Sequence, residues 1–140
     1  MANEQALAGP TAGAPSKGVI WVSRVLSAIP VLMMGFGGIM KILRNPMVLA
    51  DWSTRFGYPD GALVPIGVAE LACAVLYIIP RTSVLGAILV AGYLGGATAT
   101  HVRVSEGAFV APAVLGILAW AGLYLREPRL RALLPLRRDG

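Results

Sequence analysis

The chain has 140 residues, of which 56% are hydrophobic and 14% charged, and its mean hydropathy is +0.71. A water-soluble single domain of this length could not bury so many apolar side chains, so the composition excludes an ordinary soluble protein and indicates a bilayer environment. The net charge of +5 does not indicate nucleic-acid binding, because the Lys and Arg residues flank apolar stretches and do not alternate with aromatic side chains on one surface.

Three regions follow one another along the chain. Residues 1–17 are rich in Ala, Gly and Pro without hydrophobic periodicity, which predicts a disordered N-terminal leader. This leader does not have the pattern of a cleavable signal peptide, because the apolar run after it is long and ends at Lys41. Residues 18–127 hold four apolar runs and predict a transmembrane domain, and the arginine-rich residues 128–140 predict a basic cytoplasmic tail.

Each apolar run approaches the roughly 20 residues that a helix needs to cross about 30 Å of hydrocarbon. The runs cover residues 18–40, 61–80, 82–100 and 107–125. They are apolar on nearly every face, whereas the helices of soluble bundles have one polar face. Only Arg81 separates the second run from the third, so these two form an antiparallel hairpin. We therefore predict an all-α fold, a four-transmembrane-helix bundle with antiparallel up-down topology, whose first loop caps one end.

The positive charges predict the orientation, because the cytoplasmic flanks of membrane helices carry an excess of Lys and Arg. Eight of the twelve Lys and Arg residues fall on the side of both termini: Lys17, Arg24, Arg81, Arg126, Arg129, Arg131, Arg137 and Arg138. Four fall on the other side: Lys41, Arg44, Arg55 and Arg103. We expect a multi-pass protein with both termini in the cytoplasm and with membrane lipids as its partners.

An even number of spans places the first loop, the end of the third run and the start of the fourth on one membrane face. This face gathers Lys41, Asp51, Trp52, Arg55, Tyr58, Asp60, His101, Arg103 and Glu106. Lys41 and Arg103 are candidates to bind an anionic headgroup or substrate, although flanking cations commonly only anchor helices at the interface.

Glu70 is the one charged residue within the last three apolar runs. It lies roughly 13 Å below the loop-bearing face, near the middle of the bilayer, where an acidic side chain costs about 2.5 to 3.5 kcal/mol unless it is neutral or paired. It should therefore face the bundle interior. Gly67 and Ala74 flank it on a helical stripe that also carries Tyr77, which leaves room for a neighbouring helix or a small ligand.

Two interpretations of Glu70 stay open. It handles protons or anchors a polar ligand in an intramembrane cavity, or it is a buried carboxyl that only fixes helix packing. In the second case Glu70 is protonated or paired with Lys41, Arg103 or His101. Because roughly 13 Å of helix rise separates Glu70 from Lys41 and Arg103, we do not expect a direct salt bridge by default.

His101 follows a run of small residues in the third span, where Gly92, Gly96 and Thr100 recur at intervals of four and let another helix pack closely. Helical spacing places His101 on the adjacent stripe and directs its imidazole toward the surroundings of Glu70. A hydrogen-bonding role and proton transfer both suit this side chain. His101 is the only histidine, so a multi-histidine metal site or a bis-histidine haem within one chain is excluded.

Four strings of the sequence resemble one known family. They are Gly-Ile-Met-Lys at 38–41, Val-Ala-Glu-Leu at 68–71, Ile-Ile-Pro-Arg at 78–81 and Gly-Tyr-Leu-Gly-Gly-Ala-Thr-Ala-Thr-His-Val-Arg at 92–103. Over most of residues 20–125 the chain is similar to the DoxX-like family of small four-helix bacterial membrane proteins. The resemblance implies a place in the bacterial inner membrane. It also implies that the polar positions typical of the family are Lys41, Glu70, His101 and Arg103. The family takes its name from a membrane subunit associated with thiosulfate oxidation and quinone reduction.

Two classes of function stay open on these residues. The first, which we favour, is a nonenzymatic membrane module or subunit that binds a small lipophilic ligand or a partner protein, because no complete nucleophilic, metal or cofactor constellation is present. The second is a membrane redox subunit that acts on a quinone with a redox partner protein, with Glu70 and His101 as proton donor and acceptor. No cofactor beyond this quinone is evident, no metal site is expected, and whether the chain is an enzyme stays undecided. The candidate ligand-binding residues are Lys41, Glu70, Tyr77, His101 and Arg103.

Overall fold

The structure is a computed structural model that describes residues 15–133 of the chain, with side chains described up to residue 131. Residues 1–14 of the predicted leader and residues 134–140 of the predicted tail lie outside the described residues. The elements are α1 (Lys17–Ile42), α2 (Pro46–Thr54), α3 (Leu63–Ile78), α4 (Ser83–Arg103), α5 (Val110–Arg126) and α6 (Pro128–Leu133), with 3₁₀ turns η2 (Asp60–Ala62) and η3 (Gly107–Phe109). Within residues 15–133 there is no strand, and the predicted all-α fold is confirmed.

In the part of the chain that the structure describes, four helical segments are long and apolar enough to cross a membrane. They are Lys17–Ile42, Asp60–Ile78, Ser83–Arg103 and Gly107–Arg126, with 26, 19, 21 and 20 residues. Large apolar side chains on their outer faces, among them Trp21, Leu32 and Ile117, are exposed, which suits contact with lipid. The predicted four-helix transmembrane bundle is confirmed, and the chain is a multi-pass integral membrane protein.

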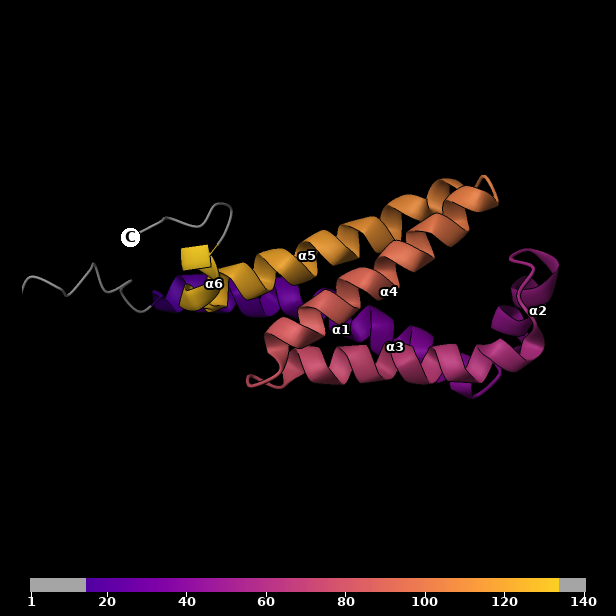
Figure 1. Cartoon of the computed structure of the whole chain (residues 1–140), viewed down its shortest axis with the longest axis horizontal. Coiled ribbons are helices and arrows are strands. Elements are labelled where there is room, and N and C mark those ends of the chain that lie inside the picture. Colours follow the sequence, from indigo (N-terminus) through magenta and orange to yellow (C-terminus); the bar gives the residue numbers. More distant parts are fainter. Residues whose placement is uncertain (1–14, 134–140) are drawn as a thin grey trace, which may run out of the picture.

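The four spans form a square bundle. α1 packs against α3 and α5, and α4 packs against the same two helices, so α1 and α4 face each other across the diagonal. Figure 1 shows the start of α1 together with α6 at one end of the bundle and α2 at the opposite end. This arrangement follows from the even number of spans.

Small residues let neighbouring helices approach each other closely. A Cβ atom placed on Gly38 of α1 would lie 3.0 Å from the carbonyl oxygen of Gly67 on α3, and one placed on Gly67 would lie 2.9 Å from the carbonyl oxygen of Gly38. Contacts this short leave no room for a side chain on either residue. The α3–α4 hairpin depends on the same effect, because a Cβ on Gly86 would collide with the Tyr77 backbone. These crossings set the heights at which side chains of adjacent helices meet.

Tyr77 ties three helices together inside the bundle. Its side chain is buried, and its hydroxyl donates a hydrogen bond to the carbonyl oxygen of Ala119 on α5 at 2.7 Å. The Ser27 hydroxyl of α1 lies 2.8 Å from the Tyr77 hydroxyl oxygen. Because the Tyr77 hydroxyl already donates to Ala119, Ser27 is the donor in this second hydrogen bond. Arg126 donates to the Tyr77 carbonyl oxygen at 3.1 Å and lies over its ring. A buried hydroxyl satisfied in this way stabilises the bundle near its terminal end.

Two short helices lie outside the four spans. α2 occupies the predicted capping loop and begins where Asn45 accepts a hydrogen bond from the Met47 amide at 3.0 Å, with Pro46 as its first residue. α6 begins at Pro128, inside the predicted basic tail, and buries Leu130 against the core. The sequence analysis predicted neither helix.

Candidate functional site

An ion pair joins α1 to α3. The Lys41 ammonium nitrogen lies 2.7 Å from Oε2 of Glu70, and the two side chains are 18% and 7% exposed. Helical side chains lean toward the N-terminus of their own helix. Because α1 and α3 run in opposite directions, Lys41 leans back toward Gly37 and Glu70 leans toward Gly67, so the two charged groups converge.

By helix rise the sequence placed Lys41 roughly 13 Å above Glu70, so a direct salt bridge was possible but was not the default expectation. The structure shows that bridge. A Cβ atom placed on Gly67 would lie 2.8 Å from Cβ of Lys41, so Lys41 sits beside a residue that is less than one turn from Glu70. α1 also ends at Ile42, beyond the apolar run, so Lys41 belongs to its last turn. Of the alternatives open for Glu70, the structure therefore shows pairing with Lys41.

Gly37 makes room for this pair. A Cβ atom at Gly37 would lie 3.0 Å from Oε1 of Glu70 and 3.5 Å from the Lys41 ammonium, which also reaches the Gly37 carbonyl oxygen at 3.5 Å. The Tyr93 side chain of α4 lies near the same carboxylate. Residues of α1 and α4 therefore both approach Glu70.

A cavity of about 590 Å³ lies between this ion pair and the capping loop. We call it the cap cavity. Its lining residues come from α1, α2, α3, α4 and the α2–α3 connection: Lys41, Met47, Val48, Asp51, Trp52, Phe56, Tyr58, Ile66, Gly92, Tyr93, Gly96, Ala97, Thr100 and His101. The cap cavity therefore combines a polar floor at Lys41 with aromatic walls.

Polar contacts connect the capping loop to the α4–α5 turn. Glu106 bridges the two, with Oε1 at 2.6 Å from the Arg55 guanidinium and Oε2 at 2.7 Å from Nδ1 of His101. Arg103 donates a hydrogen bond to the Phe56 carbonyl oxygen. The hydroxyls of Tyr58 and Thr100 lie 2.7 Å apart. These contacts join the capping loop to α4 and its following turn beside the cap cavity.

The structure brings together some of the predicted ligand-binding residues and separates others. Lys41 and His101 line the cap cavity, and Glu70 is buried beneath Lys41. His101 does not point to Glu70 as its helical stripe suggested, because its imidazole bonds to Glu106. Arg103 lies at the rim on the Phe56 carbonyl oxygen. Tyr77 lies in the core junction with Ser27 and Ala119, near the other end of the bundle.

Tyr93 is the residue of this site that sequence reasoning missed. It lies four and eight positions before Ala97 and His101, so helical spacing alone places all three on one face of α4. All three line the cap cavity. The helical spacing could therefore have identified Tyr93 as a neighbour of His101 from the sequence.

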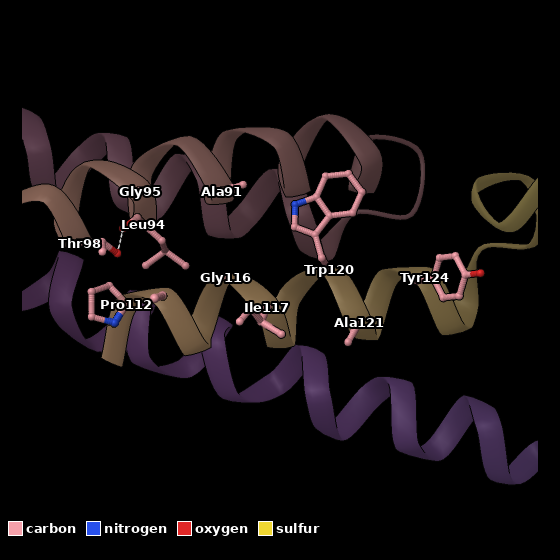
Figure 2. A pocket seen from close by; sticks show the side chains of 11 residues that line it. Ala91, Leu94, Gly95, Thr98, Pro112, Gly116, Ile117, Trp120, Ala121 and Tyr124 are labelled. Atoms are coloured by element: carbon pink, nitrogen blue, oxygen red, sulfur yellow. Dashed lines mark hydrogen bonds between the residues drawn. The ribbon is translucent and has the colours of Figure 1, made fainter. Parts of the chain in front are cut away.

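A second hollow runs along the outside of the bundle between α4 and α5. This outer groove has a volume of about 660 Å³ and is lined by Ala91, Leu94, Gly95, Thr98, Pro112, Ala113, Gly116, Ile117, Trp120, Ala121 and Tyr124, most of them shown in Figure 2. The Thr98 hydroxyl donates to the Leu94 carbonyl oxygen at 2.8 Å, and none of the lining residues is charged. The outer groove suits hydrocarbon contact and offers no acid, base or anchor for chemistry.

Comparison with known proteins finds one similarity. A sequence model described as the DoxX-like family matches residues 25–122, a stretch that includes every residue lining the cap cavity. No curated protein and no solved structure matches the chain.

Proposed function

Because the chain belongs to the DoxX-like family and is an integral membrane protein, we propose that it is a membrane module that binds a small, uncharged lipophilic molecule in the cap cavity. The observation that carries this proposal is the composition of the cavity wall. Trp52, Phe56, Tyr58 and Tyr93 provide aromatic surface, and Lys41 provides a polar group at one end. Ligand pockets typically combine apolar walls with a few placed polar groups in this way.

The charges around the cavity favour an uncharged ligand. Lys41 is neutralised by Glu70, and Arg55 is neutralised by Glu106. A charged ligand would leave water for a site in which these groups already have opposite partners, so its desolvation would not be offset. The Lys41 ammonium carries three N–H donors, so it can still offer a hydrogen bond to a carbonyl or hydroxyl oxygen of the ligand.

Replacing one glycine tests whether the cap cavity holds a ligand. Gly96 lines the cavity, and a Cβ atom there would meet no atom within 4 Å, so Gly96→Phe fills the space without disturbing the helix contacts. Gly95 has the same freedom but lines the outer groove, so Gly95→Phe is the matched control. Purified proteins are extracted with organic solvent, and the extracts are compared by mass spectrometry and absorbance.

We expect an uncharged lipophile that accompanies the unmodified protein and Gly95→Phe and is largely lost from Gly96→Phe. If the three extracts contain the same lipophiles in the same amounts per chain, the cap cavity is not a binding site and the proposal fails.

A redox function on a quinone is the second candidate. It is favoured by His101, an ionisable side chain that lines the same cavity as Lys41 and the aromatic residues. In this function His101 would exchange protons with the ligand directly, whereas Glu70 would act only through Lys41 or Tyr93. A quinone in the extract, together with reduction of that quinone by a partner protein that slows in His101→Gln, would favour this function over a nonenzymatic module.

We also infer that the chain lies in the bacterial inner membrane with both termini in the cytoplasm. The excess of Lys and Arg on the side of the termini supports this orientation, with eight of the twelve positive residues on that side. The cap cavity then lies at the outer face of the membrane.

A further inference from the structure

We propose that residues 46–59, the lid segment, form a movable lid over the cap cavity, and that Glu106 is the latch that holds it shut. The lid segment comprises α2 and most of its connection to η2. A lid matters only if the cavity takes a ligand, so this inference rests on the proposed function. Its test needs no ligand, and the two can fail independently.

The lid segment supplies much of the cavity wall. The cap cavity is lined by four residues of α2 and two of the following connection, namely Met47, Val48, Asp51, Trp52, Phe56 and Tyr58. Moving this segment away would therefore open the cavity along a whole side. The remaining lining residues belong to α1, α3 and α4, whose positions are fixed by the bundle.

Internal contacts make the lid segment one body. The rings of Trp52 and Tyr58 stack with their centroids 4.9 Å apart, and the Trp52 indole donates to the Pro59 carbonyl oxygen at 3.0 Å. The Tyr58 amide also bonds to the Trp52 carbonyl oxygen at 3.1 Å. A segment bound to itself in this way can move without losing its own structure.

The lid segment lies outside the helix bundle. Its main packing partners are its neighbours in sequence, the end of α1 and η2, whereas each span packs against two other spans. Between α1 and α2 the chain turns at Arg44, whose φ of 51° is in the left-handed region. Such a short turn at the end of an element is where hinge motion is usually absorbed.

Polar contacts, together with an edge-on contact of the Phe56 ring with the His101 ring at 5.3 Å, hold the lid segment to α4 and its following turn. Glu106 contacts both the lid segment and α4. One of its carboxylate oxygens pairs with Arg55 of the lid segment, and the other bonds to His101 of α4. Polar contacts of partly exposed groups are individually weak and can break and re-form. Loss of the Glu106 charge removes the ion pair with Arg55 and should raise the fraction of time that the lid is open.

The test measures how fast a thiol inside the cavity reacts. The single native cysteine is replaced first, as Cys73→Ala. Ala97, which is half-buried and lines the cap cavity, is then replaced by Cys. Ala91→Cys is the matched control, because Ala91 is equally half-buried on the same helix but lines the outer groove. Each is combined with Glu106→Gln in detergent-purified protein and labelled with a water-soluble maleimide.

We expect Glu106→Gln to accelerate labelling of the Ala97→Cys protein roughly three- to tenfold, because labelling follows the open fraction when the lid moves quickly. Labelling of the Ala91→Cys protein should stay unchanged. Arg55→Gln breaks the same ion pair from the lid side and should give the same acceleration. If Glu106→Gln does not elute as a folded protein in size-exclusion chromatography, the labelling rate of the Arg55→Gln variant is used instead.

An unchanged rate for the Ala97→Cys protein in folded latch variants would overturn the proposal. Equal acceleration at both cysteines would also overturn it, because it would show general loosening of the bundle instead of lid opening.

Discussion

Lys41 and Glu70 offset a cost that each would carry alone in a membrane. A single charge near the bilayer centre is unfavourable by about 2.5 to 3.5 kcal/mol on insertion scales, and the pair at 2.7 Å compensates both charges at once. Gly37 favours this pairing, because a Cβ atom there would lie 3.0 Å from Oε1 of Glu70 and would force the carboxylate to shift slightly. The ion pair thus provides a polar floor to the cap cavity and a contact between α1 and α3.

Replacing either partner of the pair should lower the free energy of unfolding, and the two losses should not be additive. We expect Lys41→Met and Glu70→Gln each to lower the free energy of unfolding by about 2 to 4 kcal/mol, because each leaves a buried polar or charged group without its partner. The double variant should lose clearly less than the sum of the two. Unfolding of the detergent-solubilised proteins with denaturant measures these values. Additive losses would contradict an energetically coupled pair.

Residue type and topology predicted which polar residues lie at the same end of the bundle. They did not predict which of these residues form ion pairs or hydrogen bonds with each other. The even number of spans brought Lys41, His101 and Glu106 to the same face. The partner of Glu70, by contrast, depends on how closely α1 crosses α3, and the Gly38–Gly67 contact that sets this crossing is visible only in three dimensions. The partner of His101 depends likewise on the turn that brings Glu106 back to it.

At the scale of elements, the four spans could be predicted because their outward side chains contact lipid and remain apolar on every side. Their ends could be predicted less well. α4 continues through His101 to Arg103, beyond the last apolar residue of its run, because a helix extends into the polar interface without a change of backbone structure. α2 and α6 have nine and six residues, too few to show in a hydropathy pattern, although Asn45-Pro46 and Pro128 are ordinary helix-start signals.

At the scale of the whole molecule, the even number of spans separates two ends with different tasks. The end that carries α6 and the start of α1 is closed by the Tyr77 junction and by Leu130. The opposite end carries α2 (Figure 1). The cap cavity lies at this end, beneath the lid segment. Any ligand that enters from solution must therefore come from the side opposite the termini.

Cysteine accessibility in intact bacteria tests the orientation. In the Cys73→Ala background, Ala2→Cys and Asp139→Cys should resist a membrane-impermeant maleimide until the inner membrane is permeabilised. Thr54→Cys, in the exposed part of the lid segment, should react without permeabilisation. Labelling of the two terminal cysteines from opposite sides would refute the even number of spans, and labelling of both from outside would refute the orientation.

The most direct test of the account is an experimental density map of the protein in nanodiscs formed from its own membrane. We predict non-protein density of an uncharged lipophile in the cap cavity, with a polar atom within hydrogen-bond distance of the Lys41 ammonium and Lys41 still paired with Glu70. A cap cavity that holds only ordered water, or one collapsed by movement of α4 toward α1, would contradict the account.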